Sequence, residues 1–197
     1  MNSVAAGRSA RPLYQVEGFR TARLNMTEQE VREAINRDFP TTGTGTRRTG
    51  NVDSQTNRVF RTTALVVTVR DLMPDTGTAR VEYILGYQTR KLIQVNVIWG
   101  TPADPQAPLE VVQTAAARLQ TFFLQENFPA ERRAANVQQG NELVMFRGRD
   151  SQGRTVEVVA QAQPAAREGQ RGTHSVRLSY ILNPEQPDVY TLRRGDF

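Results

Sequence analysis

The chain has 197 residues, no cysteine and a single histidine, His174, with a formal net charge of +5 at pH 7. These counts exclude disulfides, thiolate metal sites, cysteine nucleophiles and any metal site built from several histidines. All basic residues except Lys91 are arginines, and the positive excess lies in residues 1–100. No apolar run approaches the roughly 20 residues of a membrane-spanning helix. The composition is that of a globular protein with one domain or two small ones.

Residues 1–18 are expected to form a polar arm whose last positions pack on the domain. The best helix signal follows at 25–39, where Thr27 and Glu30 fit a capping box and Pro40 ends the pattern. Apolar residues recur there at helical spacing on one face, namely Val31, Ala34, Ile35 and Phe39. The glycine- and threonine-rich segment 41–57, which carries Arg47 and Arg48, is predicted to be a long loop.

Residues 58–99 alternate apolar and polar side chains in three runs, which predicts an antiparallel meander with one buried face. The buried face is expected to hold Leu65, Val67, Val69, Ala79, Val81, Tyr83, Leu85, Ile93, Val95, Val97 and Trp99. The opposite face is expected to be solvated and to hold Thr68, Arg70, Arg80, Glu82, Gln94 and Asn96. Such a sheet needs a helical layer on its apolar side.

The proline-rich segment 101–107 predicts a boundary, and Pro108 suits the start of a second helix that runs to about residue 126. The apolar stripe of this helix consists of Leu109, Val112, Ala116, Leu119 and Phe123. Strands are predicted at 143–146, 156–160 and 176–182, with a turn from Asp150 to Gly153 and a polar loop at 161–174. The tail, with Val189, Tyr190 and Leu192, suits a short final strand.

The two halves match in outline, because each has a helix, a polar loop and a hairpin with an Asp…Gly turn. Both also contain the triplet Tyr-Ile-Leu, at 83–85 and 180–182. We therefore predict an α+β fold made by tandem duplication, each repeat being an antiparallel sheet with helices packed on one face. The predicted divisions are an arm at 1–18, a first repeat at 19–100, a linker at 101–107 and a second repeat at 108–197.

The stretch from Leu24 to Val31, Leu-Asn-Met-Thr-Glu-Gln-Glu-Val, resembles a helix opening found in small bacterial envelope proteins. These are the β-lactamase-inhibitor-protein-like and SmpA/OmlA (BamE-like) group, whose usual opening is Gly-Met-Thr-x-x-x-Val. Asn25 stands where that group has glycine, and the second half lacks the motif. The resemblance implies a helical pair on an antiparallel sheet, a unit that the inhibitor proteins contain twice, and a role in protein binding without catalysis.

No catalytic, cofactor or metal signature is present, so the sequence predicts a protein that is not an enzyme and needs no cofactor. His174 lies in a polar loop, where an ordinary surface role explains it. Asp71, Asp75 and Gly77 lack the alternating oxygen ligands of a calcium loop and suit a turn. Two carboxylates gathered in one pocket, such as Asp150 with Glu157, would reopen the question of enzymatic activity.

Another protein is the predicted partner, bound through a sheet face, loop tips or an open strand edge. The candidate contact residues lie in two places. Arg47 and Arg48 form an arginine pair in the first loop, and Tyr87, Arg90 and Lys91 lie at the tip of a hairpin. The alternative is an arginine-rich cytoplasmic binder of nucleic acid or another polyanion. Nucleic acid is disfavoured, because the basic residues alternate with acids and no aromatic side chains are interleaved for base stacking.

The first residues, Met1 to Gly7, contain no apolar segment of the kind found in export signals. We expect a periplasmic location if a leader has been removed before this start, and a cytoplasmic one otherwise. The sequence does not specify the oligomeric state or the identity of the partner.

Overall fold

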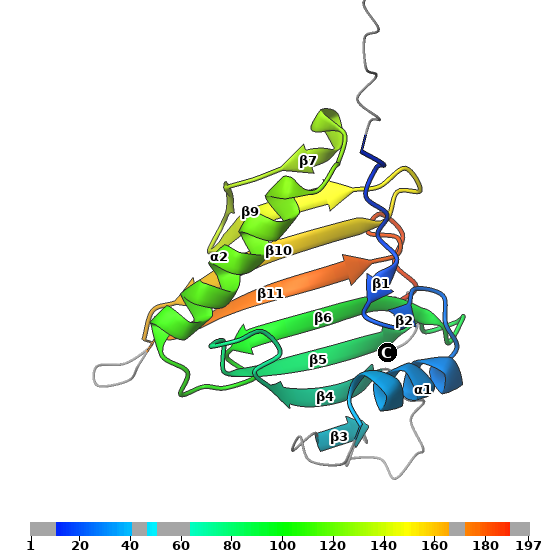
Figure 1. Cartoon of the computed structure of the whole chain (residues 1–197), viewed down its shortest axis with the longest axis horizontal. Coiled ribbons are helices and arrows are strands. Elements are labelled where there is room, and N and C mark those ends of the chain that lie inside the picture. Colours follow the sequence, from blue (N-terminus) through cyan, green and yellow to red (C-terminus); the bar gives the residue numbers. More distant parts are fainter. Residues whose placement is uncertain (1–10, 41–46, 51–63, 166–171, 190–197) are drawn as a thin grey trace, which may run out of the picture.

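The structure is a computed structural model that describes residues 11–40, 47–50, 64–165 and 172–189. Its centre is a nine-stranded antiparallel sheet with the strand order β3-β4-β5-β6-β11-β10-β9-β7, and β8 also pairs with β9. The helices α1 and α2 lie on the same side of this sheet (Figure 1). The protein is therefore an α+β protein with an antiparallel sheet and, among the described residues, two α-helices.

Helix α1 spans Glu28–Asp38, and the predicted capping box is confirmed in detail. The Thr27 backbone amide donates to a Glu30 carboxylate oxygen at 2.7 Å, while the Glu30 amide donates to the Thr27 hydroxyl at 3.4 Å. Val31, Ala34 and Ile35 are buried, as is Phe39 at the C-cap, so the predicted apolar face is the packed one. Before this helix, the short strands β1 (Gly18–Phe19) and β2 (Ala22–Arg23) pair with each other.

The first half of the sheet consists of β3 (Arg47–Gly50), β4 (Ala64–Arg70), β5 (Thr78–Leu85) and β6 (Leu92–Gly100). The meander of β4, β5 and β6 was predicted correctly. The segment 41–57 was predicted to be a loop throughout, and this is wrong for residues 47–50, which pair with β4. At the start of β6, Leu92 and not Ile93 belongs to the apolar core, because the register of the β5–β6 pair shifts after Ile84.

The second half begins with α2 (Leu109–Gln125) and a short 3₁₀ helix (Ala130–Arg132). Its strands are β7 (Arg133–Ala134), β8 (Val137–Gln139), β9 (Glu142–Arg149), β10 (Thr155–Gln163) and β11 (Thr173–Ile181). The apolar stripe of α2 is buried from Val112 onward, whereas Leu109 is half exposed. Strand β10 continues into the segment predicted as a polar loop, and residues from Tyr190 onward lie outside the described part.

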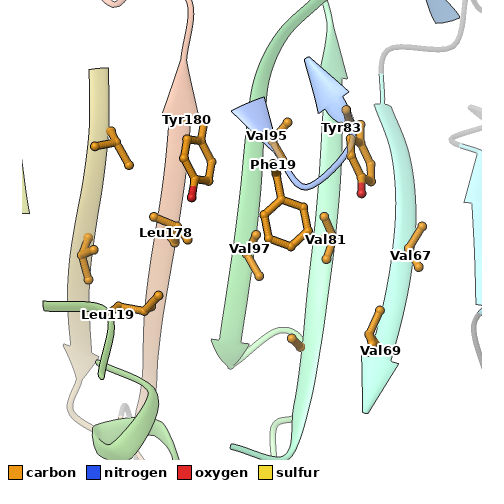
Figure 2. Close-up of a cluster of buried hydrophobic side chains, with 14 of the residues drawn as sticks. Phe19, Val67, Val69, Val81, Tyr83, Val95, Val97, Leu119, Leu178 and Tyr180 are labelled. Atoms are coloured by element: carbon orange, nitrogen blue, oxygen red, sulfur yellow. The ribbon is translucent and has the colours of Figure 1, made fainter. Parts of the chain in front are cut away.

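One face of the sheet carries registered rows of apolar side chains beneath the helices. The central row runs across six strands and consists of Val67, Val81, Val97, Leu178, Val158 and Phe146. Figure 2 shows part of this cluster, with Phe19 and Leu119 approaching the sheet from the covering layer. All these residues belong to one apolar core, so burial on this face holds the helices to the sheet.

The two halves share this one sheet, because β6 and β11 pair side by side from Gln94–Ile181 to Gly100–Ser175. Across the sheet, the main strands of the first half follow the order β4, β5, β6, and those of the second half follow the reverse order β11, β10, β9. The third main strand of each half therefore lies next to that of the other half. The Tyr-Ile-Leu triplets do not follow this correspondence, since Tyr83 lies in β5 and Tyr180 in β11. The triplets thus give no support to the predicted duplication.

The described end of the arm is fastened to the second half, as predicted for its last residues. The Tyr14 amide donates to the Asn127 carbonyl at 2.9 Å, and the Tyr14 ring lies 5.0 Å from that of Phe128. The Val16 amide donates to a buried Asp150 carboxylate oxygen at 3.0 Å. The arm therefore crosses the helical side of the sheet before the chain enters α1 (Figure 1).

Candidate functional site

The second face of the sheet is the most extensive surface on which chemical groups gather. In the part of the chain that the structure describes, both helices pack on the opposite face. Strand pairing places three rows of side chains on this second face, which we call the open face. The first row is Thr68, Arg80, Ile98, Arg177, Val159 and Val144; the second is Val66, Glu82, Asn96, Ser179, Glu157 and Arg147; the third is Ala64, Ile84, Gln94, Ile181, Thr155 and Arg149.

The middle of the open face is a hydrogen-bonded polar network. The Ser179 hydroxyl donates to the Asn96 side-chain oxygen at 2.9 Å, and the Gln94 amide donates to the same oxygen at 2.8 Å. The Asn96 amide in turn lies 3.5 Å from a Glu82 carboxylate oxygen. Asn96 is only 8% exposed and Ser179 is fully buried. The expectation that Asn96 is solvated is therefore wrong: longer neighbouring side chains cover short ones at the centre of a wide sheet.

Arginines on the open face are matched with acids in most positions. Arg80 Nε lies 2.8 Å from Glu82, and Arg147 Nε donates to Glu157 at 2.9 Å. Arg149 donates to Glu185, which follows β11, at 2.8 Å. These pairs fix the orientation of the guanidinium groups and reduce the net charge of the face. Arg177 is the exception among the arginines in the three rows, since the described residues provide no acid within 4.0 Å of it.

Two hollows open on this face, the larger beside β9 and β10 and the smaller between β6 and β9. The larger has a volume of about 930 Å³ and is rich in arginine, its lining including Arg132, Arg133, Arg147 and Arg149. The smaller has a volume of about 130 Å³ and lies beside Arg177, with Ile98, Val159 and Ser175 among its walls. A surface with charged, polar and apolar groups in register, and with hollows between them, has the chemical mixture of a protein-binding surface.

Three of the sequence-predicted contact residues lie together on the turn between β5 and β6. Tyr87 is 44% exposed, Arg90 lies 3.8 Å from Glu28 of α1, and Lys91 forms an isolated bridge with Thr27. The turn is also attached to the segment after β11, because the Asp188 carboxylate accepts from the amides of Gln88 and Thr89 at 3.0 and 2.9 Å.

The Asp188 carboxylate also accepts the Thr89 hydroxyl at 2.6 Å. That side-chain bond, followed by the two amide bonds, lowers the pKa of Asp188 below its ordinary value. The turn that carries Tyr87, Arg90 and Lys91 is thus held by internal contacts at both ends, and only part of it is available to a partner.

Arg47 and Arg48 lie on β3, at the edge of the sheet described by the structure, where they pair with Thr68 and Val67. Strands β4 and β5 separate them from β6 and from the turn that precedes it. The five residues proposed from the sequence are therefore divided between two places.

Two residues considered for catalysis, Asp150 and His174, make structural contacts. The buried Asp150 carboxylate accepts from Arg154 Nε at 2.7 Å and from the amides of Gln152 and Arg154. Asp150 is absent from the lining of the larger hollow, but Glu131 and Glu157 both line it, so two carboxylates do share this hollow. His174 Nε2 lies 3.1 Å from the Ala107 carbonyl, beside an apolar cavity of about 310 Å³ under α2. Among the described residues no cluster of three or more potential metal ligands is found.

No family model, curated protein or solved structure matches this chain. The resemblance to the envelope proteins therefore remains a prediction from the motif at Leu24–Val31. No helix within the described ranges is long and apolar enough to cross a membrane.

Sequence reasoning identified some open-face positions as polar and named a sheet face among the possible binding surfaces, but it assigned none of the candidate contact residues to that face. The signal was present in the alternation, since Arg177 and Ser179 alternate with the apolar Val176, Leu178 and Tyr180. What the sequence did not contain was the pairing of β6 with β11. That pairing brings the polar positions of the two halves onto one surface.

Proposed function

We propose that this protein is a non-catalytic interaction module that binds another protein through the open face of its sheet. The observation that carries the proposal is the continuous open face, on which side chains from both halves stand in three registered rows. The opposite face is used to build the core, so binding through the open face leaves the packing of the helices unchanged.

The size of the open face suits a protein partner. Six strands of about eight residues present an area of roughly 29 Å by 27 Å, or about 800 Å². A stable protein complex buries about 800 Å² on each partner. The face also mixes isoleucine, arginine and amide side chains, as protein interfaces do. A single copy of this face is therefore large enough to form one complete interface.

A polyanion such as nucleic acid is the alternative partner, and the charge distribution favours it less. Binding many phosphates requires arginines whose charge is available. On the open face Arg80, Arg147 and Arg149 each lie beside a carboxylate. Interspersed acids of this kind oppose phosphate and suit a partner that itself carries both signs of charge.

A bacterial envelope location and an origin by duplication complete the proposal. The motif at Leu24–Val31 supports the envelope location, and it lies where α1 begins. The mirrored strand order on either side of the β6–β11 pair supports duplication. The hairpin turns at Asp71–Gly77 and Asp150–Gly153 occupy corresponding positions in the two halves, between the first and second main strands.

The test is affinity capture with two matched variants. Ile181→Arg changes a partly exposed side chain on the open face, and Phe122→Arg changes a side chain that is 50% exposed on the outer surface of α2. Proteins captured by the wild type should be retained by Phe122→Arg and reduced at least tenfold by Ile181→Arg. Circular dichroism should show that both variants are folded.

Salt and nuclease distinguish the two kinds of partner. A complex that depends on six to ten phosphate contacts should weaken by about 10³–10⁵ between 50 and 200 mM salt. We expect the captured proteins to remain bound at 200 mM salt after nuclease treatment. Loss under either condition would support the polyanion alternative, and retention by Ile181→Arg would reject the open face as the binding surface.

A further inference from the structure

Arg177 occupies an unusual position in the first row of the open face. Its direct cross-strand neighbours are Ile98 on β6 and Val159 on β10, both of which are buried and apolar. Strand β11 lies in the middle of the strand order, so this guanidinium stands on a central strand of the proposed interface, one row from its middle. Residues that contribute most to binding are enriched in arginine and cluster in desolvated positions near the centre of an interface.

The described part of the chain leaves Arg177 without a counter-ion. Its Nε atom is buried and has no hydrogen-bond partner there, and no carboxylate lies within 4.0 Å of the guanidinium. Glu142 lines the same small hollow but forms no ion pair with it. Arg80 Nε also lacks a well-oriented hydrogen bond, yet Arg80 lies beside Glu82. Arg177 is thus the arginine of the three rows whose charge the described part of the chain does not neutralise.

A charge in such surroundings destabilises the free protein, because no counter-ion offsets its partial loss of hydration. A carboxylate that meets the guanidinium repays this cost and forms two parallel hydrogen bonds. We infer that the protein partner inserts an aspartate or glutamate side chain into the small hollow and pairs it with Arg177. The inference rests on the proposed function and specifies the chemistry of the partner.

The hollow itself favours an acidic side chain over a phosphate. Its volume is about 130 Å³, and Ile98, Pro102 and Val159 provide apolar walls. Ser175 and Gln161 add polar groups at the same place. The methylene groups of an aspartate or glutamate can contact the apolar walls while the carboxylate reaches the arginine. A phosphate group is larger than a carboxylate and carries a higher negative charge, which Glu142 would repel more strongly.

The test is a selection of random displayed peptides on the full-length protein, which requires no knowledge of the partner. We expect peptides selected on the wild type to share an aspartate or glutamate at one position. Arg177→Gln should abolish that enrichment. The matched control is Arg70→Gln, which removes the same charge from an exposed position on the same side of β4 as Thr68.

Affinity measurements on one selected peptide make the inference quantitative. Arg177→Gln should weaken binding roughly 30-fold or more, as expected for a buried charge pair that loses one member. Replacing the aspartate or glutamate shared by the selected peptides with asparagine or glutamine should weaken binding to a similar extent. Arg70→Gln should change the affinity less than about threefold. Glu142→Gln should strengthen binding, because it removes a competing negative charge from the hollow.

Several outcomes would overturn the inference and can be told apart. Peptides that bind the open face without a shared acid would reject the role of Arg177 and leave the proposed function standing. Preference for a phosphoserine peptide over its glutamate equivalent would reject a carboxylate partner. A complete absence of peptides that compete at the open face would reject both proposals. A lower unfolding midpoint for Arg177→Gln would identify Arg177 as a packing residue, since no ion pair is lost.

Discussion

The covered and open faces of the same sheet differ in how they gain stability. The row Val67–Val81–Val97–Leu178–Val158–Phe146 is apolar on every strand, and the helices exclude water from it. The neighbouring row on the other face includes Glu82, Asn96, Ser179, Glu157 and Arg147, which satisfy one another. The covered face depends on volume and shape, whereas the open face depends on the completeness of its hydrogen bonds.

The largest effect should come from the covered face. Trp99 is 1% exposed within the apolar core, so Trp99→Ala should lower the free energy of unfolding by about 3–5 kcal/mol through lost burial and the cavity that remains. Urea unfolding followed by far-ultraviolet circular dichroism measures this change. The control is Ile181→Ala, a partly exposed position on the open face, and we expect less than half the effect. Equal losses at the two positions would mean that both faces are packed alike.

A smaller effect should come from the open face, by a different mechanism. Asn96→Ala removes the oxygen that accepts the Ser179 hydroxyl and the Gln94 amide, and Ser179 is fully buried. Leaving a buried donor without an acceptor should cost about 1–3 kcal/mol. The double variant with Ser179→Ala should recover part of this loss in the same urea experiment. If the two losses simply add, the network does not act as a unit.

The smallest effect concerns the turn beyond the open face and depends on pH. The pKa of Asp188 is lowered in the folded protein, so its stabilising contacts are complete above its ordinary value of 3.8. They should be lost as the pH falls through the lowered pKa. Backbone amide signals of Gln88 and Thr89 in NMR spectra should shift together in that range. Asp188→Asn should remove the transition, and a transition that persists in this variant would assign it to another group.

The sequence predicted more of the covered face than of the open face. The alternation of apolar residues identified the covered face at ten of its predicted positions, because an apolar residue type by itself predicts burial. Ile93 is buried as predicted but lies outside the apolar core cluster, because a shift in strand register places Leu92 there. Leu109 was misplaced because it begins its helix beyond the edge of the packed surface.

The open face was less predictable, since its chemistry depends on partners far apart in the chain. Asn96 and Ser179 become neighbours only through the pairing of β6 with β11. Asn96 was predicted to be exposed because its side chain is polar, but it is buried and accepts a hydrogen bond from Ser179. The turn between β5 and β6 is exposed at Tyr87 and Lys91, whereas Arg90 is partly buried. The attachment of this turn through Asp188 had no local signal in the sequence.

The pairing of β6 with β11 also affects how the protein is made. During synthesis, residues 92–100 leave the ribosome long before residues 173–181 exist to pair with them. Until then β6 has an unpaired edge and an apolar side without α2 above it, which is a surface prone to aggregation. The sheet is also dominated by contacts distant in sequence, which slows folding. Completion of the open face is consequently a late event in synthesis, because it requires the last of the described strands.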